Sequence, residues 1–371
     1  MKLLYIVEDF AENGGVERIV SQKANIFSSQ YNHDVTIVSV YRDSRKIQYS
    51  INENVKFISL DVPFANKEKG KFTTFYSRLS IFIIAIRRLN RVVSLVNPDI
   101  IFFTTTLGAL LLPWCRTKAY KVYESHTARR FTPFNHFFFF FTELKADAIV
   151  CLTDGDANEY KIARRVEVIP NFIDEPLYSV KDYSVRKAIA VGRLEWVKGF
   201  DILIDCWKEL KKEHPNWHLD IYGEGTMRAE LQLQINRLEL QDDVKLCGRN
   251  ENIMDVYPHY SLHVMPSRYE GQGIALIEAQ ACALPSVVTD YIYGASDIVT
   301  SRFNGILVRQ GDKEAMVNAI LEMMDSEKLR QEYGNNARIV AQKYAKDNII
   351  CKWVKLISSL QSTNAPSCIT P

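Results

Sequence analysis

The sequence predicts an α/β protein of two domains, each built on a parallel β-sheet with helices on both faces. The first observation is length, because 371 residues exceed what one hydrophobic core usually serves. The second is that short apolar runs rich in β-branched residues alternate with segments of helical periodicity, which is typical of covered parallel sheets. The third is that this alternation starts again near the middle of the chain.

The expected elements fall into two series. The first series has expected strands at residues 3–7, 35–40, 55–60, 100–103, 120–123, 148–152 and 166–169. A loop from Pro170 to Pro176 then gives the simplest domain boundary. The second series has expected strands at residues 188–191, 219–222, 244–246, 262–265, 286–289 and 306–308. Apolar side chains at helical spacing predict a last helix over residues 344–360.

Composition and charge exclude several classes of protein. A net charge of +2 predicts no nucleic-acid partner. The seven cysteines form no CxxC pair, which favours buried free thiols in a reducing cytoplasm. The start turns acidic at Glu8, too early for a signal peptide. The uncharged stretch at residues 100–115 is shorter than the roughly 20 apolar residues of a spanning helix, so we expect a cytoplasmic protein.

A glycine pair follows the first expected strand. Gly14 and Gly15 stand before an amphipathic pattern in residues 19–27 that includes Lys23. Glycines at a strand-to-helix turn allow close approach of a ligand and offer free amides to an anion. A plain tight turn is the alternative. The pair is not the GxGxxG fingerprint, which argues against a nicotinamide dehydrogenase.

Two cations stand at the start of the second series. Arg193 and Lys198 follow an expected strand end and lie beside Gly192 and Gly199. An arginine fork and a lysine point charge are suited to clamp a diphosphate. A solvated charged loop is the alternative.

Two carboxylates follow the expected strand at 262–265. Glu270 lies in a glycine-containing loop, and Glu278 lies in the second turn of the apolar helix that comes next. A carboxylate can accept two hydrogen bonds from a vicinal diol, the pattern that ribose and hexose rings present. The alternatives are an exposed loop acid at Glu270 and a capping or paired carboxylate at Glu278.

Backbone amides add to this segment. Gln272, Gly273 and Ile274 stand at the expected helix start, where their N–H groups are suited to phosphate or sugar oxygens.

These motifs in this order resemble the family-4 retaining glycosyltransferases of the GT-B fold. The specific parts are the glycine pair 14–15, the stretch 192–199 and the Glu-x7-Glu spacing of Glu270 and Glu278. The likeness covers nearly the whole chain.

The resemblance implies two Rossmann-like domains that face a central cleft and bind different substrates. Residues 1–170 would bind the acceptor, and residues 171–343 would bind a nucleotide sugar. A helix at about 344–371 would cross back onto the first domain.

The resemblance also implies roles for single residues. Gly15, next to Gly14, would approach the phosphates, and Arg193 with Lys198 would neutralise the diphosphate. Glu278 would bind the ribose hydroxyls.

Three further residues take their roles from the resemblance. Glu270 would hold the donor hexose, Arg249 would lie near the base, and His126 would face the donor sugar. A histidine with its hydrogen bonds satisfied at a strand end is the alternative for His126.

The implied reaction is a front-face transfer with retention. The leaving diphosphate takes the acceptor proton, so no protein nucleophile is needed, unlike in retaining hydrolases. Stabilisation of the developing charge is the main expected contribution. Apart from Asp154-Gly155-Asp156, which stands far along the chain from Arg193 and Lys198, nothing in the sequence resembles a divalent-metal site that holds a diphosphate, so we expect neither a metal nor another cofactor. A UDP-sugar is the expected donor, with galactose, glucose and the N-acetylhexosamines all open, because the segments 283–285 and 294–297 depart from the family pattern.

Basic and aromatic segments suggest where the acceptor binds. Residues 67–91 carry seven cations and one acid around the apolar run 81–86, and residues 129–141 begin with two arginines and end in five consecutive phenylalanines. Such segments can rest on the inner face of an anionic membrane, which would fit a lipid-linked glycan acceptor in bacterial surface polysaccharide synthesis. The alternatives are a core helix with a solvated basic face, and a soluble glycan acceptor.

Two other functions fit part of this pattern. A nucleotide-sugar 2-epimerase would share the fold and bind the same donor. A non-catalytic nucleotide-sugar-binding partner would bind donor and never release diphosphate.

Overall fold

The computed structural model describes residues 1–11, 14–41, 47, 49–63, 71–126, 129, 136–176 and 178–362. The chain divides into two compact units. The first contains Met1–Ile169 and Ser358–Pro371, and the second contains Pro170–Ile357.

The first unit is a seven-stranded parallel sheet with the order β3-β2-β1-β4-β5-β6-β7. Its strands are β1 (Lys2–Val7), β2 (Asp34–Tyr41), β3 (Lys56–Val62), β4 (Ile100–Thr104), β5 (Tyr120–Ser125), β6 (Ala148–Cys151) and β7 (Val166–Val168). Its helices are α1 (Gly15–Ser29), α2 (Lys71–Val96), α3 (Thr105–Leu111), η1 (Leu112–Trp114), α4 (His136–Lys145) and α5 (Asp154–Ala157).

The second unit is a six-stranded parallel sheet with the order β10-β9-β8-β11-β12-β13. Its strands are β8 (Lys187–Val191), β9 (His218–Tyr222), β10 (Val244–Gly248), β11 (Leu262–Met265), β12 (Ser286–Asp290) and β13 (Gly305–Arg309). Its helices are η4 (Trp196–Lys198), α6 (Phe200–Glu213), α7 (Arg228–Arg237), α8 (Ile253–Val256), η5 (Tyr257–His259), α9 (Ile274–Ala281), α10 (Ala295–Ile298), α11 (Lys313–Asp325), α12 (Glu327–Ala341) and η6 (Gln342–Tyr344).

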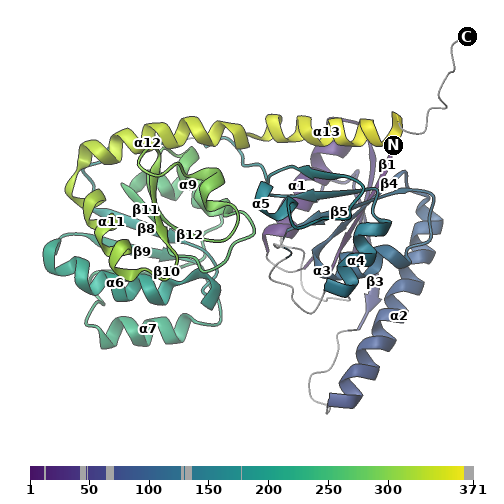
Figure 1. Cartoon of the computed structure of the whole chain (residues 1–371), viewed down its shortest axis with the longest axis horizontal. Helices are drawn as coiled ribbons and strands as arrows, with labels where there is room; N and C mark the ends of the chain where they lie inside the picture. Colours follow the sequence, from purple (N-terminus) through teal and green to yellow (C-terminus); the bar gives the residue numbers. More distant parts are fainter. Residues whose placement is uncertain are drawn as a thin grey trace, which may run out of the picture. The chain divides into compact units, whose positions relative to one another are not determined.

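Each sheet is covered by helices on both faces (Figure 1). In the second unit, apolar side chains of α6, α7 and α11 share one core with the sheet, and those of α9 form another with β11 and β12. In the first unit, α2, α3 and α4 pack on one face. Helix α1 supplies Lys23, whose Nζ lies 5.2 Å from the centre of the Tyr5 ring of β1. These two sheets confirm the α/β fold class expected from the alternation of strands and helices.

Helix α13 (Lys346–Ser362) joins the two units within the chain. The expected helix began at 344 and was assigned with residues 1–170. In the structure the residues up to Ile357 belong to the second unit, and only those from Ser358 belong to the first. The side chains show the reason, since Lys346 pairs with Asp174 whereas Ser359 accepts a hydrogen bond of 2.8 Å from Arg165.

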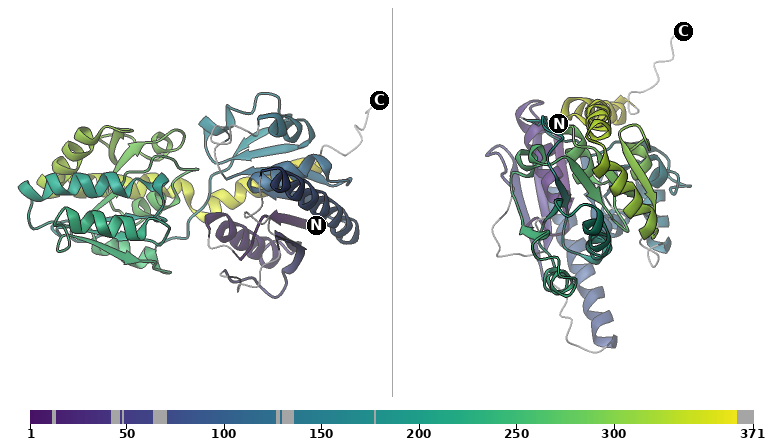
Figure 2. Two further views of the ribbon diagram at one scale, coloured as in Figure 1. Left: turned by 90° about the horizontal axis from the view of Figure 1, so that it is seen from below. Right: turned by 90° about the vertical axis from the view of Figure 1, so that its left-hand side faces the viewer.

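Two expectations about exposure are corrected. Cys351 is exposed and Cys247 is partly exposed, so the free thiols are not all buried. The apolar run 81–86 in α2 mostly packs against the core of the first unit, although Ile83 is exposed. Figures 1 and 2 show the first turns of α2 extending beyond the edge of the sheet. In the part of the chain that is described, no helix is long and apolar enough to cross a bilayer.

A buried histidine in β11 predicts a pH dependence of stability. Burial lowers the pKa of His263 to about 3, and its Nδ1 lies 3.1 Å from Ser286 Oγ. The unfolded chain, with a histidine pKa of about 6.5, binds a proton on this imidazole below that pH. The folded chain does not bind this proton until the pH is far lower. This contribution to stability is therefore present above pH 6.5 and is lost as the pH falls below it, by about 1.4 kcal/mol between pH 7.5 and 5.5.

We expect His263→Gln to lose less stability over this interval than the wild type, as measured by urea unfolding at both pH values. His218→Gln is the control, because His218 is exposed and should leave the dependence unchanged. An identical pH dependence in His263→Gln and the wild type would contradict the assignment.

Candidate active site

The loop after β8 packs tightly on the loop after β11. Gly199 has a φ of 68°, and a Cβ there would collide with the carbonyl oxygen of Pro266. The amide of Arg268 donates to the carbonyl of Val197 at 2.8 Å. Only glycine combines this left-handed conformation with so close an approach, so Gly199 fixes how the two loops meet.

This packing brings together Lys198 and Glu270, which are 72 residues apart. Lys198 Nζ lies 2.6 Å from Glu270 Oε1, and the side chains are 16% and 9% exposed. Ser267 Oγ donates to the same carboxylate oxygen at 2.7 Å. Glu270 is therefore a partly buried carboxylate that accepts hydrogen bonds from Lys198 and Ser267. This rules out the alternative that Glu270 is an exposed loop acid.

Helix α9 begins with backbone N–H groups that have no acceptor among the described residues. Gly273 is its N-cap, with a φ of 95°, and a Cβ there would collide with the Tyr291 hydroxyl. That hydroxyl donates to the carbonyl of Gln272 at 2.8 Å. Among the residues that the structure describes, none accepts a hydrogen bond from the amides of Gln272, Gly273 or Ile274. A helix start of this kind attracts anions and hydroxyl oxygens.

The side chain of Gln272 makes a hydrogen bond within the second unit. Its Oε1 accepts a hydrogen bond of 2.9 Å from the amide of Asn171, which ties the loop to the start of the second unit. Its Nε2 is buried and has no partner among the described residues.

Glu278 and the two predicted arginines differ in exposure. Glu278 lies in the second turn of α9 and is 6% exposed. Arg193 and Arg249 are exposed. Over the described part of the chain, neither arginine side chain makes a hydrogen bond or a close ion pair, so both guanidinium groups are available to a ligand.

Three predicted site residues belong to the first unit. Gly14 is the N-cap of α1, and Gly15 opens that helix, as expected for the glycine pair. The carboxylate of Glu17 lies beside Gly14, which places a negative charge where an anion was expected. His126 follows β5, and its Nε2 lies 3.3 Å from Glu124 Oε2.

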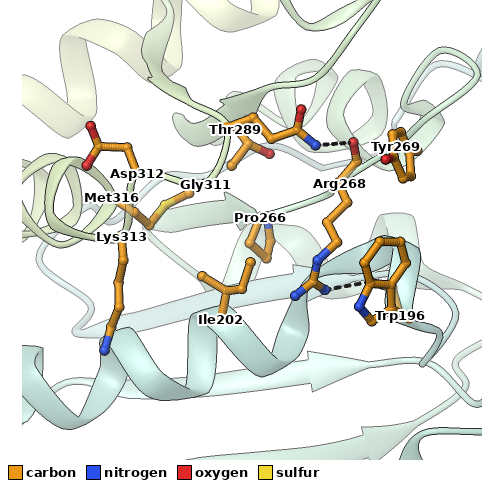
Figure 3. Close-up of a pocket in the computed structure, with 11 residues that line it drawn as sticks. Trp196, Ile202, Pro266, Arg268, Tyr269, Thr289, Gly311, Asp312, Lys313 and Met316 are labelled. Carbon is orange, nitrogen blue, oxygen red and sulfur yellow. Dashed lines mark hydrogen bonds between the residues drawn. The ribbon is translucent and has the colours of Figure 1, made fainter.

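A small pocket of about 200 Å³ is lined by residues that include Trp196, Arg268 and Tyr269 (Figure 3). Arg268 stacks on Trp196 with its guanidinium carbon 4.6 Å from the ring centre, and it pairs with Asp201 at 2.7 Å. No predicted site residue lines this pocket. Arg268 also donates to the main-chain oxygen of Trp196, which links the loop after β11 to the loop after β8.

Sequence reasoning missed several supporting residues. Ser267 and Tyr291 act through contacts between distant segments, and no sequence signal marks them. Lys23 did carry a signal, because a lysine on the apolar side of a helix is unusual unless it is paired. It pairs with Glu124, which was not among the candidate residues.

Two family models match successive parts of the chain. The model described as Glycosyltransferase Family 4 matches residues 13–175, and the model described as Glycosyl transferases group 1 matches residues 179–340. The chain is a family-4 glycosyltransferase.

Curated relatives of this glycosyltransferase have low sequence identity. The amylovoran biosynthesis glycosyltransferase AmsD of Erwinia amylovora is 26% identical over 96% of this chain and 99% of its own length. A Campylobacter jejuni enzyme is 24% identical over 98% and 99%. Its name describes an α-1,4-N-acetyl-D-galactosaminyltransferase acting on a GalNAc-containing diNAcBac-PP-undecaprenol. The chain spans only 41% of an exopolysaccharide phosphotransferase of Streptomyces coelicolor, to which it is 23% identical.

Solved structures identify the fold of the glycosyltransferase as GT-B. A sucrose-phosphate synthase of Thermosynechococcus elongatus superposes with a TM-score of 0.84 at 15% identity, covering 98% of this chain and 100% of that one. HepE of Anabaena, in complex with UDP and glucose, superposes with a TM-score of 0.76 at 18% identity, covering 98% and 100%.

Proposed function

We propose that this glycosyltransferase moves a hexose from a UDP-sugar to a hydroxyl of a lipid-linked glycan, with retention, in bacterial surface polysaccharide synthesis. The observation that carries the proposal is the Lys198–Glu270 pair at 2.6 Å, in the unit that also holds the unpaired amides at the start of α9. A cation, a carboxylate and free N–H groups are the groups that a sugar diphosphate needs.

Each group has a chemical task in the proposed reaction. Lys198 and the exposed Arg193 stabilise the charge that develops on the leaving diphosphate. Glu270 accepts hydrogen bonds from the hexose hydroxyls, and Glu278 accepts them from the ribose. Because Lys198 is already paired with Glu270, the donor has to share this lysine with the carboxylate.

The UDP-sugar donor is also supported by the relatives. One structure of the same fold was solved with UDP and glucose, and another, a pneumococcal O-GlcNAc transferase, with UDP and GlcNAc. Within the described residues, no cluster of His, Cys, Asp and Glu side chains is placed to hold a metal ion. Metal independence remains a prediction that a chelator tests.

A lipid-linked acceptor is supported by apolar side chains beside cations in the first unit. Phe140 and Leu144 of α4 are 46% and 41% exposed, and Lys145 ends the same helix. Trp114 is 55% exposed and precedes Arg116. Exposed aromatic groups next to cations favour an anionic membrane surface. Of the predicted membrane segments, residues 67–70 and 130–135 lie outside the described part of the chain.

The proposal is tested by nucleotide release from UDP-, GDP- and ADP-sugars in EDTA, with and without a bacterial lipid extract. We expect slow release of UDP from one sugar, stimulated at least several-fold by the extract, and an α-configured product from an α-configured donor. Activity that needs added Mg²⁺ would contradict the metal-independent mechanism. UDP-sugar binding without release under any condition would instead favour a non-catalytic partner.

A further inference from the structure

A lysine lies in the interior of the first unit. Lys23 of α1 is fully buried, and its Nζ lies 2.5 Å from Oε2 of Glu124 in β5. The aromatic rings of Tyr5 and Phe102 lie next to the same Nζ, at 5.2 and 5.9 Å from their centres. Placing a charged pair in such surroundings costs stability relative to an apolar pair, so a role beyond packing is expected.

The carboxylate of Glu124 connects this lysine to His126. Oε2 lies 2.5 Å from Lys23 Nζ and 3.3 Å from His126 Nε2, and the three side chains are 1%, 2% and 7% exposed. Oε1 is buried and has no partner among the described residues. One oxygen atom therefore receives both contacts.

The charge of Glu124 follows from its neighbours. Burial acts to raise the pKa of Glu124, but the charge of Lys23 and the hydrogen bonds from His126 and Lys23 together lower it. The carboxylate is therefore ionised at neutral pH and can only accept hydrogen bonds. A neutral histidine facing it must carry its hydrogen on Nε2, which leaves the lone pair on Nδ1.

We propose that Lys23 and Glu124 are positioning residues that hold His126 in the Nε2–H tautomer. Lys23 keeps the buried carboxylate charged, and Glu124 orients the ring, so that Nδ1 accepts a hydrogen bond from a hydroxyl of the donor sugar. This inference rests on the proposed function for the sugar contact, whereas the tautomer itself does not depend on it.

The tautomer is measured on the full-length protein without substrate. The ¹⁵N shifts of the His126 ring, assigned with His126→Asn, should show the hydrogen on Nε2 in the wild type. The variant Lys23→Met/Glu124→Gln removes both buried charges together, which avoids leaving one unpaired. Because the new carboxamide can donate as well as accept, we expect a mixture of tautomers. An Nδ1–H ring in the wild type, or no change in the variant, would overturn the proposal.

Kinetics test whether the pair acts through His126. We expect Lys23→Met/Glu124→Gln to lower kcat at saturating donor roughly 10- to 100-fold, the range seen when a carboxylate that orients a metal-bound histidine is removed, with little change in KM. In the His126→Asn background the same two substitutions should cost less than about 2-fold, because coupled residues are not additive. Equal losses in both backgrounds would assign the pair to stability alone. If no sugar nucleotide is turned over, the proposed function fails while the ring shifts still decide the positioning role.

Discussion

Glu278→Gln is expected to lower kcat/KM for the sugar nucleotide about 100-fold, mainly through a higher KM. Glu278 is buried in the second turn of α9, where its proposed task is to accept two hydrogen bonds from the ribose. Hydrogen bonds to a charged group contribute roughly 1.5–3 kcal/mol each, and glutamine replaces one accepting oxygen by a donor. Because the ribose contact is present in both the bound donor and the transition state, the loss should fall on binding.

Steady-state kinetics with the preferred donor, together with calorimetric titration of UDP, would measure this effect. Glu230→Gln is the matched control, since Glu230 is an exposed glutamate of α7 and should leave both values unchanged. Unaltered UDP affinity in Glu278→Gln would show that this carboxylate serves the fold and not the nucleotide.

Lys198→Met should lower kcat by about 100- to 1,000-fold, the effect usually seen when one group that stabilises developing negative charge is removed. Lys198 is mostly buried beside Glu270, so its charge is poorly screened by water and acts strongly on a nearby diphosphate. Lys198→Arg keeps the charge and should recover part of the activity. Lys208→Met, at an exposed position of α6, is the matched control.

A double-mutant cycle with Glu270→Gln separates two readings of Lys198. In the proposed reaction Lys198 contacts both Glu270 and the diphosphate, so Lys198→Met should retain a large effect on kcat in the Glu270→Gln background. If Lys198→Met has no further effect there, the lysine only orients Glu270. Tight donor binding with full kcat in Lys198→Met would remove this residue from the mechanism.

Much of the fold could be predicted from local patterns. The bounds of each strand in both sheets differ by at most two residues from those of an expected apolar run. Parallel strands covered on both faces are almost continuously apolar, which makes them visible in the sequence. Glu278 was expected in the second turn of a helix and Glu270 in the loop before it, and the structure places both there. A glycine pair before a helical pattern likewise marked the start of α1.

The divided last helix could not be predicted in this way. Residues 344–360 show the helical period, but this pattern does not determine which hydrophobic core each turn of the helix packs against. The pairing of Lys346 with Asp174 and the hydrogen bond from Arg165 to Ser359 depend on where distant segments end in space.

The sequence by itself determined the family, the two-sheet architecture and most of the candidate residues, because these follow from local spacing and residue type. Only the tertiary structure decided which of these residues meet. Lys198 reaches Glu270 because Gly199 lets two loops pack closely, and Lys23 reaches Glu124 because α1 covers the face of the sheet on which β5 presents that carboxylate. Contacts between segments far apart in the chain depend on how helices and loops pack on a sheet, and no local pattern contains that information.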